Sequence, residues 1–159
     1  MGDVVYLHVG CANKYYEGFV NSDSSLGWKG RIYRLDLQMD MSKPWPYKDS
    51  TVDGIAGVAV FQQLLWRDLV FAFREAYRVL KEGKILRIGV PFLDNGNTID
   101  YLLGWNNTNL LSYELLEGVL TKHVGFSKCR LQNYKVSDDM KLAELDNRPE
   151  QLFYVEATK

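Results

Sequence analysis

The chain has 159 residues, the size of one domain, and its 19 Lys and Arg against 20 Asp and Glu, without a basic run, do not predict a nucleic-acid partner. Its two cysteines cannot form a disulfide framework, which indicates a reducing compartment. Because no segment reaches the ~20 consecutive apolar residues of a membrane span and no leader pattern precedes the first predicted strand, we expect one cytoplasmic domain over 1–159, without a membrane partner.

Short apolar runs alternate with helical patterns along the chain, which is typical of an α/β sheet. The runs of the first part predict strands over 4–9, 19–23, 31–37, 52–60 and 85–90. The connection between the first two strands is too short for a crossover helix. The spacing of apolar residues predicts a helix over 66–80, ended by the Lys and Gly that follow it.

The pattern is weaker after the fifth strand. A short helix is predicted over 99–105, and Ser112 is a suitable cap for a helix over 113–124. Two further strands are predicted over 129–134 and 152–157, of which the second can insert antiparallel beside the fifth. The sequence therefore predicts an α/β fold with a mostly parallel central sheet and an antiparallel strand near its C-terminus.

Polar or small residues follow the predicted strands at the end where a parallel sheet binds ligands. The first strand runs straight into the turn 10–13, Gly-Cys-Ala-Asn, and such a turn presents backbone N–H groups. Asp23 and Asp36 stand at the ends of the second and third strands, so these groups should converge. A carboxylate can accept both hydroxyls of a ribose or an exocyclic amine, although aspartates at these places also serve as caps and turn formers.

The other candidate residues are better explained by packing or solvation. His8 lies inside the first strand, where a hydrogen-bonded core histidine is more common than a catalytic one. Cys11 can be read as a reactive thiol or as a small packing residue, and we favour packing. The acids within 138–146 have no histidine near them in sequence, so we expect no metal site. The sequence identifies no catalytic residue.

Several segments, in order, resemble the small class I S-adenosylmethionine-dependent methyltransferases. These segments are 7–11, 18–23, 35–37, 44–47 with 49–53, and 77–88. The match runs from about Tyr6 to Pro91. The tail, with 145–148 and 154–157, also resembles the ending of a subgroup of predicted methyltransferases.

The resemblance implies a Rossmann-like class I methyltransferase fold with S-adenosylmethionine as the cofactor. The turn 10–13 would lie under its methionine part, Asp23 would hold the ribose, Asp36 with the backbone of Leu37 would meet the adenine, and the loop 57–60 would lie beside the transferred methyl group. The implied cofactor-binding residues are Gly10, Cys11, Ala12, Asn13, Asp23, Asp36, Leu37, Val58 and Ala59.

The chain departs from the family pattern at two of these places. The usual Gly-Cys-Gly is Gly10-Cys11-Ala12, a change that a negative φ at Ala12 would tolerate. Polar Ser-His and Glu-His pairs common around the fourth-strand loop in relatives are replaced by Val58-Ala59 and by Gln62-Gln63. A methyl sulfonium is already activated, so this loss argues against the relatives' acceptor more than against methyl transfer.

Three functions stay open. We favour methyl transfer to a small-molecule or glycan-precursor acceptor, ahead of a methyltransferase-like module that binds the cofactor, or nothing, and acts through a partner. A Rossmann dehydrogenase comes third, because the turn lacks the later glycines of Gly-x-Gly-x-x-Gly. No helix precedes the first strand, which leaves two alternatives: an open site, or a homodimer in which a second subunit completes it.

Overall fold

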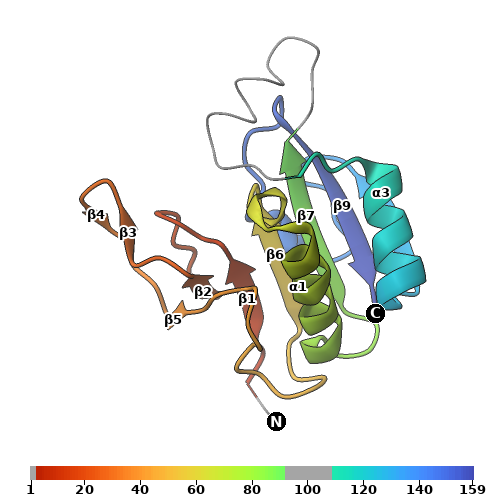
Figure 1. Ribbon diagram of the computed structural model, residues 1–159, viewed down its shortest axis with the longest axis horizontal. Coiled ribbons are helices and arrows are strands. Elements are labelled where there is room, and N and C mark those ends of the chain that lie inside the picture. Colours follow the sequence, from red (N-terminus) through yellow and green to blue (C-terminus); the bar gives the residue numbers. More distant parts are fainter. Residues whose placement is uncertain (1–2, 92–108) are drawn as a thin grey trace.

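The computed structural model of the protein describes residues 3–91 and 109–159. Its main feature is a sheet of seven strands in the order β5-β2-β1-β6-β7-β9-β8 (Figure 1). The strands are β1 (Tyr6–Val9), β2 (Val20–Asp23), β5 (Leu37–Gln38), β6 (Gly54–Val58), β7 (Ile85–Pro91), β8 (Lys128–Gln132) and β9 (Leu152–Thr158). β9 is antiparallel to β7 and β8, and the other pairs are parallel. This confirms the predicted α/β fold.

The predicted third strand, 31–37, is wrong in both its bounds and its pairing. Arg31–Ile32 is β4, which forms a separate two-stranded hairpin with β3 (Gly27–Trp28), and only Leu37–Gln38 pairs with β2. The two residues between β3 and β4, Lys29 and Gly30, have φ of +47° and +79°. Two consecutive positive φ values are those of a tight hairpin turn, which folds the chain back before it can join the main sheet.

One face of the sheet carries the long helix α1 (Trp66–Val79), whose apolar stripe explains its prediction. The helix α3 (Tyr113–Glu117) lies on the same face and continues into η2 (Gly118–Val124), which has π-helical bonding and ends at Gly125 with φ +112°. The predicted cap is confirmed, because the Ser112 hydroxyl accepts from the Leu115 N–H at 3.3 Å. The helix predicted over 99–105 lies outside the described residues.

The opposite face is covered by the tail of the chain. The short helix α4 (Met140–Ala143) contributes Leu142 to a small core with four other buried residues: Phe19, Ala56, Ile85 and Leu145. The connection between β1 and β2 contains no helix, as predicted. The tail therefore covers this side of the sheet near β1.

Within the described part of the chain, no helix is long and apolar enough to cross a membrane.

Candidate functional site

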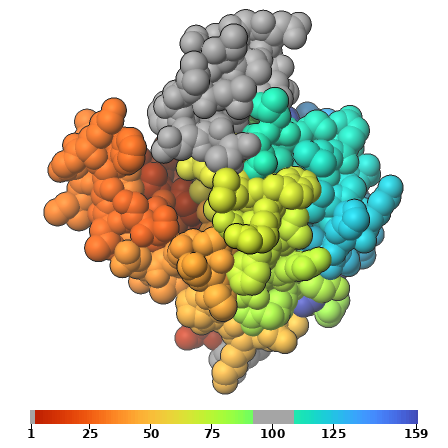
Figure 2. All heavy atoms as spheres, viewed as in Figure 1, coloured from red at the N-terminus to blue at the C-terminus, as the bar shows by residue number. Residues whose placement is uncertain are grey.

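A cavity of about 600 Å³ opens at the carboxyl ends of the parallel strands. Its walls come from the turn after β1, from Asp23 at the end of β2, from the β3–β4 hairpin, from the segment 58–63, which includes the one-turn helix η1 (Phe61–Gln63), and from the segment 147–152. Figure 2 shows the hollow between the orange hairpin region and the yellow segment after β6, with the dark-red start of the chain at its floor. Segments far apart in the sequence thus meet at one site.

Most of the residues singled out from the sequence line this cavity. They are Gly10, Cys11, Ala12, Asn13, Asp23, Val58 and Ala59. Asp36 and Leu37 do not line it. The expected convergence of strand ends is thus found for β1, β2 and β6.

The turn after β1 is shaped by positive backbone angles. Gly10 has φ +65°, and a Cβ at this position would lie 2.2 Å from Cγ2 of Val60. Ala12 has φ +46°, so the negative angle that would suit an alanine here is not adopted. Its N–H donates to Oδ2 of Asp23 at 3.0 Å, which holds the turn against the end of β2. A strained alanine kept in place by a neighbouring strand is typical of a functional turn.

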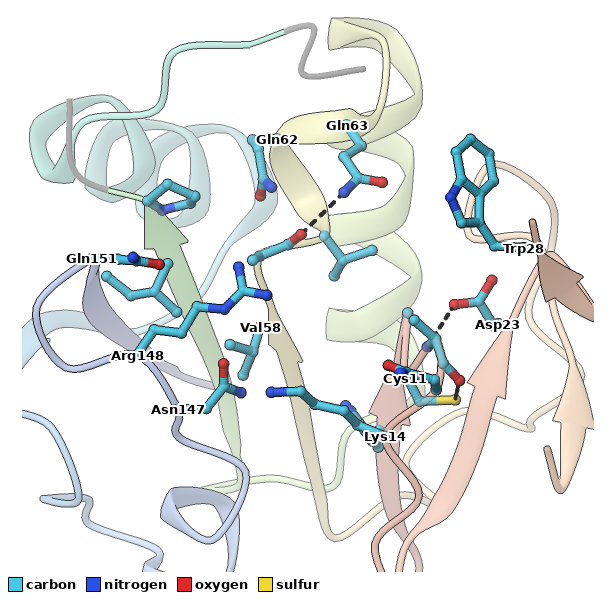
Figure 3. A pocket seen from close by; sticks show the side chains of 18 of the residues that line it. Cys11, Lys14, Asp23, Trp28, Val58, Gln62, Gln63, Asn147, Arg148 and Gln151 are labelled. Atoms are coloured by element: carbon cyan, nitrogen blue, oxygen red, sulfur yellow. Dashed lines mark hydrogen bonds between the residues drawn. The ribbon is translucent and has the colours of Figure 1, made fainter. Parts of the chain in front are cut away.

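Asp23 keeps spare capacity to accept hydrogen bonds. Its Oδ2 accepts from Ala12, and its Oδ1 accepts from the N–H of Ser25 at 2.9 Å. A carboxylate offers about four lone-pair sites, so two remain for a ligand. In Figure 3, Asp23 lies near Trp28 on one wall of the cavity.

The prediction that Asp36 ends a strand is wrong, and its carboxylate is hydrogen-bonded to other residues of the protein. Because β5 begins at Leu37, Asp36 precedes the strand instead of ending it. Its Oδ2 accepts from the backbone N–H of Asn21 at 2.8 Å and from the Asn21 side chain at 3.0 Å, and its Oδ1 accepts from the Tyr15 hydroxyl at 2.8 Å. Burial alone would raise the pKa of this carboxyl, but these hydrogen bonds hold the pKa below its usual value.

Cys11 lines the cavity, but its thiol is not suited to nucleophilic chemistry. Its thiol is buried, and burial, together with the negative charge of Asp23, raises its pKa to about 12. A thiol that stays protonated at neutral pH is a poor nucleophile.

His8 is buried at the cavity edge with one ring nitrogen engaged. Its Nδ1 lies 3.1 Å from Oδ1 of Asn21. The Asn21 amide group donates to carbonyls of Tyr16 and Phe19, while its Oδ1 also accepts from the Tyr16 N–H, so this oxygen is an acceptor and His8 Nδ1 carries the proton. The neutral ring then has its lone pair on Nε2, the form that can accept a proton.

The burial of His8 predicts a pH dependence of stability. Burial lowers its pKa, an effect that the Asn21 contact and the Asp23 charge oppose, so the unfolded chain binds this proton at higher pH than the folded one. The free energy of unfolding should therefore fall as pH drops below about 6.5, and His8→Gln should flatten this slope. Urea unfolding at pH 7 and pH 5 measures it. His123→Gln, which removes an exposed histidine of η2, is the control; equal slopes for His8→Gln and wild type would contradict the prediction.

Two walls of the cavity contain residues to which the sequence analysis assigned no role in the site. The hairpin contributes Trp28, Arg31 and Tyr33, and the tail contributes Asn147 and Arg148 among others. The Lys-Gly pair at the hairpin turn is the one local signal for the first wall. The second wall depends on where β9 carries the tail, which no local pattern shows.

Comparison with known proteins places these observations in a family. A family model described as methyltransferase domain matches residues 9–88, just over half of the chain. No curated protein matches the chain. The fold is similar to solved structures of low identity, which bear on the fold alone.

Three of these structures cover nearly all of the chain. A SAM-dependent methyltransferase from Archaeoglobus fulgidus has 14% identity and a TM-score of 0.74, with 99% of this chain and 87% of that chain covered. One from Thermotoga maritima, described as a possible histamine N-methyltransferase, has 17% identity and a TM-score of 0.69, covering 100% and 84%. One from Mesorhizobium loti has 15% identity and a TM-score of 0.63, covering 99% and 92%.

The family model begins at Val9, the last residue of β1, and covers β2, β5, β6 and the first four residues of β7. The carboxyl ends of β1, β2 and β6, which line the cavity, fall within this match. Motif order, sheet topology and this match agree with one another. The chain therefore belongs to the class I S-adenosylmethionine-dependent methyltransferases, and S-adenosylmethionine is its cofactor.

Proposed function

We propose that this chain transfers the methyl group of S-adenosylmethionine to a small-molecule or glycan-precursor acceptor. The turn 10–13, Asp23 and the pair Val58-Ala59 would form the cofactor site. The observation that supports this most is that these segments, from three different strands, meet at one cavity.

The residues present fit the cofactor. The backbone at Gly10 leaves no room for a side chain, which is typical of a turn that a ligand approaches closely. Asp23 has acceptor sites left for ribose hydroxyls, and the Trp28 ring on the same wall can stack on a base. A volume of about 600 Å³ lies in the ordinary range for ligand sites. Asp36 and Leu37 are left out of the proposal, because neither lines the cavity.

When bound, the cofactor supplies an activated methyl sulfonium. The protein's part is then to align the acceptor with it, since good orientation alone is worth roughly 7–11 kcal/mol. Val58 and Ala59 bring apolar groups to the end of β6, where they would exclude water. His8 is the lining side chain whose neutral form has a free lone pair for an acceptor proton.

Cofactor binding is the first test. Calorimetric titration of the wild-type chain with S-adenosylhomocysteine should give binding, and Asp23→Ala should weaken it about ten-fold or more, since hydrogen bonds to a carboxylate are strong. Asp23 also holds Ala12 and Ser25, so Asp23→Asn, which retains an acceptor oxygen, separates loss of charge from loss of shape. Unchanged affinity in both variants would contradict the assigned role.

The matched control is Asp68→Asn. Asp68 lies in the first turn of α1 and does not line the cavity, and its substitution by Asn removes the same charge as Asp23→Asn. It should leave the affinity for S-adenosylhomocysteine unchanged. Thermal melting of each variant shows that it is folded.

A second candidate is a cofactor-binding module that acts through a partner. The observation that favours it is the end of β6, where Val58, Ala59, Gln62 and Gln63 line the cavity and none of them can titrate. An acceptor panel with labelled S-adenosylmethionine separates the two candidates. Methylated product supports the enzyme; cofactor binding without product from any class supports the module.

A further inference from the structure

Two cationic side chains reach into the cavity from opposite walls. Lys14 follows the turn after β1, and Arg148 belongs to the tail segment before β9. Figure 3 shows both side chains pointing into the space beside Val58, on the side away from Asp23 and Trp28. Two cations thus lie next to the strand end where methyl transfer is proposed, while a third lining cation, Arg31, belongs to the hairpin wall.

The positive charge of Arg148 acts on Lys14. The pKa of Lys14 is lowered by partial burial and by the positive charge of Arg148. Within residues 3–91 and 109–159, no ion pair joins Lys14 to a carboxylate. Two acids, Asp23 and Glu150, also line the cavity. An anion between Lys14 and Arg148 would relieve their repulsion.

Arg148 is held at this place by a rigid segment. Asp146, two residues before it, is buried and accepts two hydrogen bonds from the buried Arg87 guanidinium, at 2.8 and 2.5 Å. The N–H of Asn147 donates to the Tyr154 hydroxyl at 3.1 Å. The Arg148 carbonyl accepts from the N–H groups of Gln151 and Leu152. The segment 146–152 is therefore fixed on both sides of Arg148.

The backbone of Arg148 is also strained. Its φ is +57°, an angle that a side chain other than glycine adopts rarely, and Pro149 follows it. Strain kept by a rigid surrounding is found mostly at ligand sites. The strain and the buried anchor together indicate that the direction of the Arg148 side chain matters.

From this geometry we infer that Lys14 and Arg148 form an oxyanion subsite that binds a carboxylate or phosphate group of the methyl acceptor. A guanidinium and an ammonium can bind such a group with charge-assisted hydrogen bonds. The acceptor is then an acid, anchored beside the end of β6. The inference rests on the proposed function, because it names the class of acceptor for the same site.

Anion binding to the cofactor-loaded protein tests it. The full chain, saturated with S-adenosylhomocysteine, is titrated with inorganic phosphate and with acetate at fixed ionic strength. We expect millimolar binding of at least one probe, weakened about five-fold or more by Lys14→Gln and by Arg148→Gln. The preferred probe distinguishes phosphate from carboxylate. Absence of binding to wild type, or binding by both variants as tight as that of wild type, would overturn the inference.

The matched control is Arg67→Gln. The Arg67 side chain is 92% exposed on α1 and does not line the cavity, and its loss changes the net charge by the same amount. It should bind both probes as wild type does. Weakening by this control as well would show a general charge effect and would count against the subsite.

The cofactor carries a carboxylate of its own, which Lys14 and Arg148 could bind in place of an acceptor's. A second titration distinguishes these two alternatives. S-adenosylhomocysteine is compared with 5′-methylthioadenosine, which lacks the amino acid part. If Lys14→Gln or Arg148→Gln weakens the first ligand and not the second, the pair holds the cofactor and the inference is wrong. Failure of wild type to bind either nucleoside counts against the proposed function instead, and the two probes then test the subsite in the ligand-free chain.

Discussion

Arg87→Met is expected to lower the free energy of unfolding by about 3–5 kcal/mol, because it leaves two carboxylates buried without their cation. Arg87 lies in β7 with its side chain fully buried. It donates twice to Asp146 and once to Glu156, the latter at 2.7 Å, and its guanidinium lies 4.8 Å from the ring centre of Tyr154. Burial alone would lower the pKa of the Arg87 guanidinium, but hydrogen bonds and charge interactions with the two acids raise this pKa, so Arg87 stays cationic.

Urea unfolding followed by circular dichroism measures the effect. Arg67→Met, at an exposed position of α1, is the control and should change stability by less than about 0.5 kcal/mol. Adding Asp146→Asn and Glu156→Gln to Arg87→Met should recover part of the loss, because neutral amides are less costly to bury. A loss below about 1 kcal/mol in the single variant would show that the network contributes little.

Gly10→Ala is expected to destabilise the fold by about 2–4 kcal/mol, from overpacking and from a left-handed backbone angle together. The new Cβ would lie 2.2 Å from Cγ2 and 2.7 Å from Cβ of Val60, so the turn after β1 must move. Since this turn is one wall of the cavity, affinity for S-adenosylhomocysteine should fall as well. Chemical unfolding and calorimetric titration measure the two effects.

Gly83→Ala provides a matched control. Gly83 has φ +71°, close to that of Gly10, but a Cβ there would meet nothing within 4 Å. Gly83→Ala should lower the free energy of unfolding only by the cost of the left-handed backbone angle, about 1–2 kcal/mol. Val60→Ala added to Gly10→Ala should restore part of the stability; a double variant no more stable than Gly10→Ala would show that the contact with Val60 is not the cause.

The sequence predicted the central strands and α1 because their signals are local. Val9 and Ile55 lie in apolar runs that become buried strands, and the apolar stripe of α1 places Phe73 against the sheet. The prediction of a strand over 31–37 was wrong because a run of residues that favours β-structure does not show which strand it will pair with. The Lys29-Gly30 turn paired its first residues with Trp28 instead of with β2.

The same difference explains which site residues could be predicted. Asp23 was predicted correctly because it ends a strand that the sequence marks well, whereas Asp36 was misplaced along with the bounds of its strand. Lys14 and Arg148 come together only because β9 inserts between β7 and β8 and carries the tail across the sheet. A contact between residues so far apart depends on the whole topology, not on a local pattern.

The position of β9 also has a consequence for how the protein is made. During synthesis the strands β1, β2, β5, β6 and β7 leave the ribosome long before the segment 147–152 and β9. The strands up to β7 can pair early, but one wall of the cavity forms only after the segment 147–152 has been synthesised. We therefore expect a nascent chain to be unable to bind its ligands until the segment 147–152 and β9 have left the ribosome.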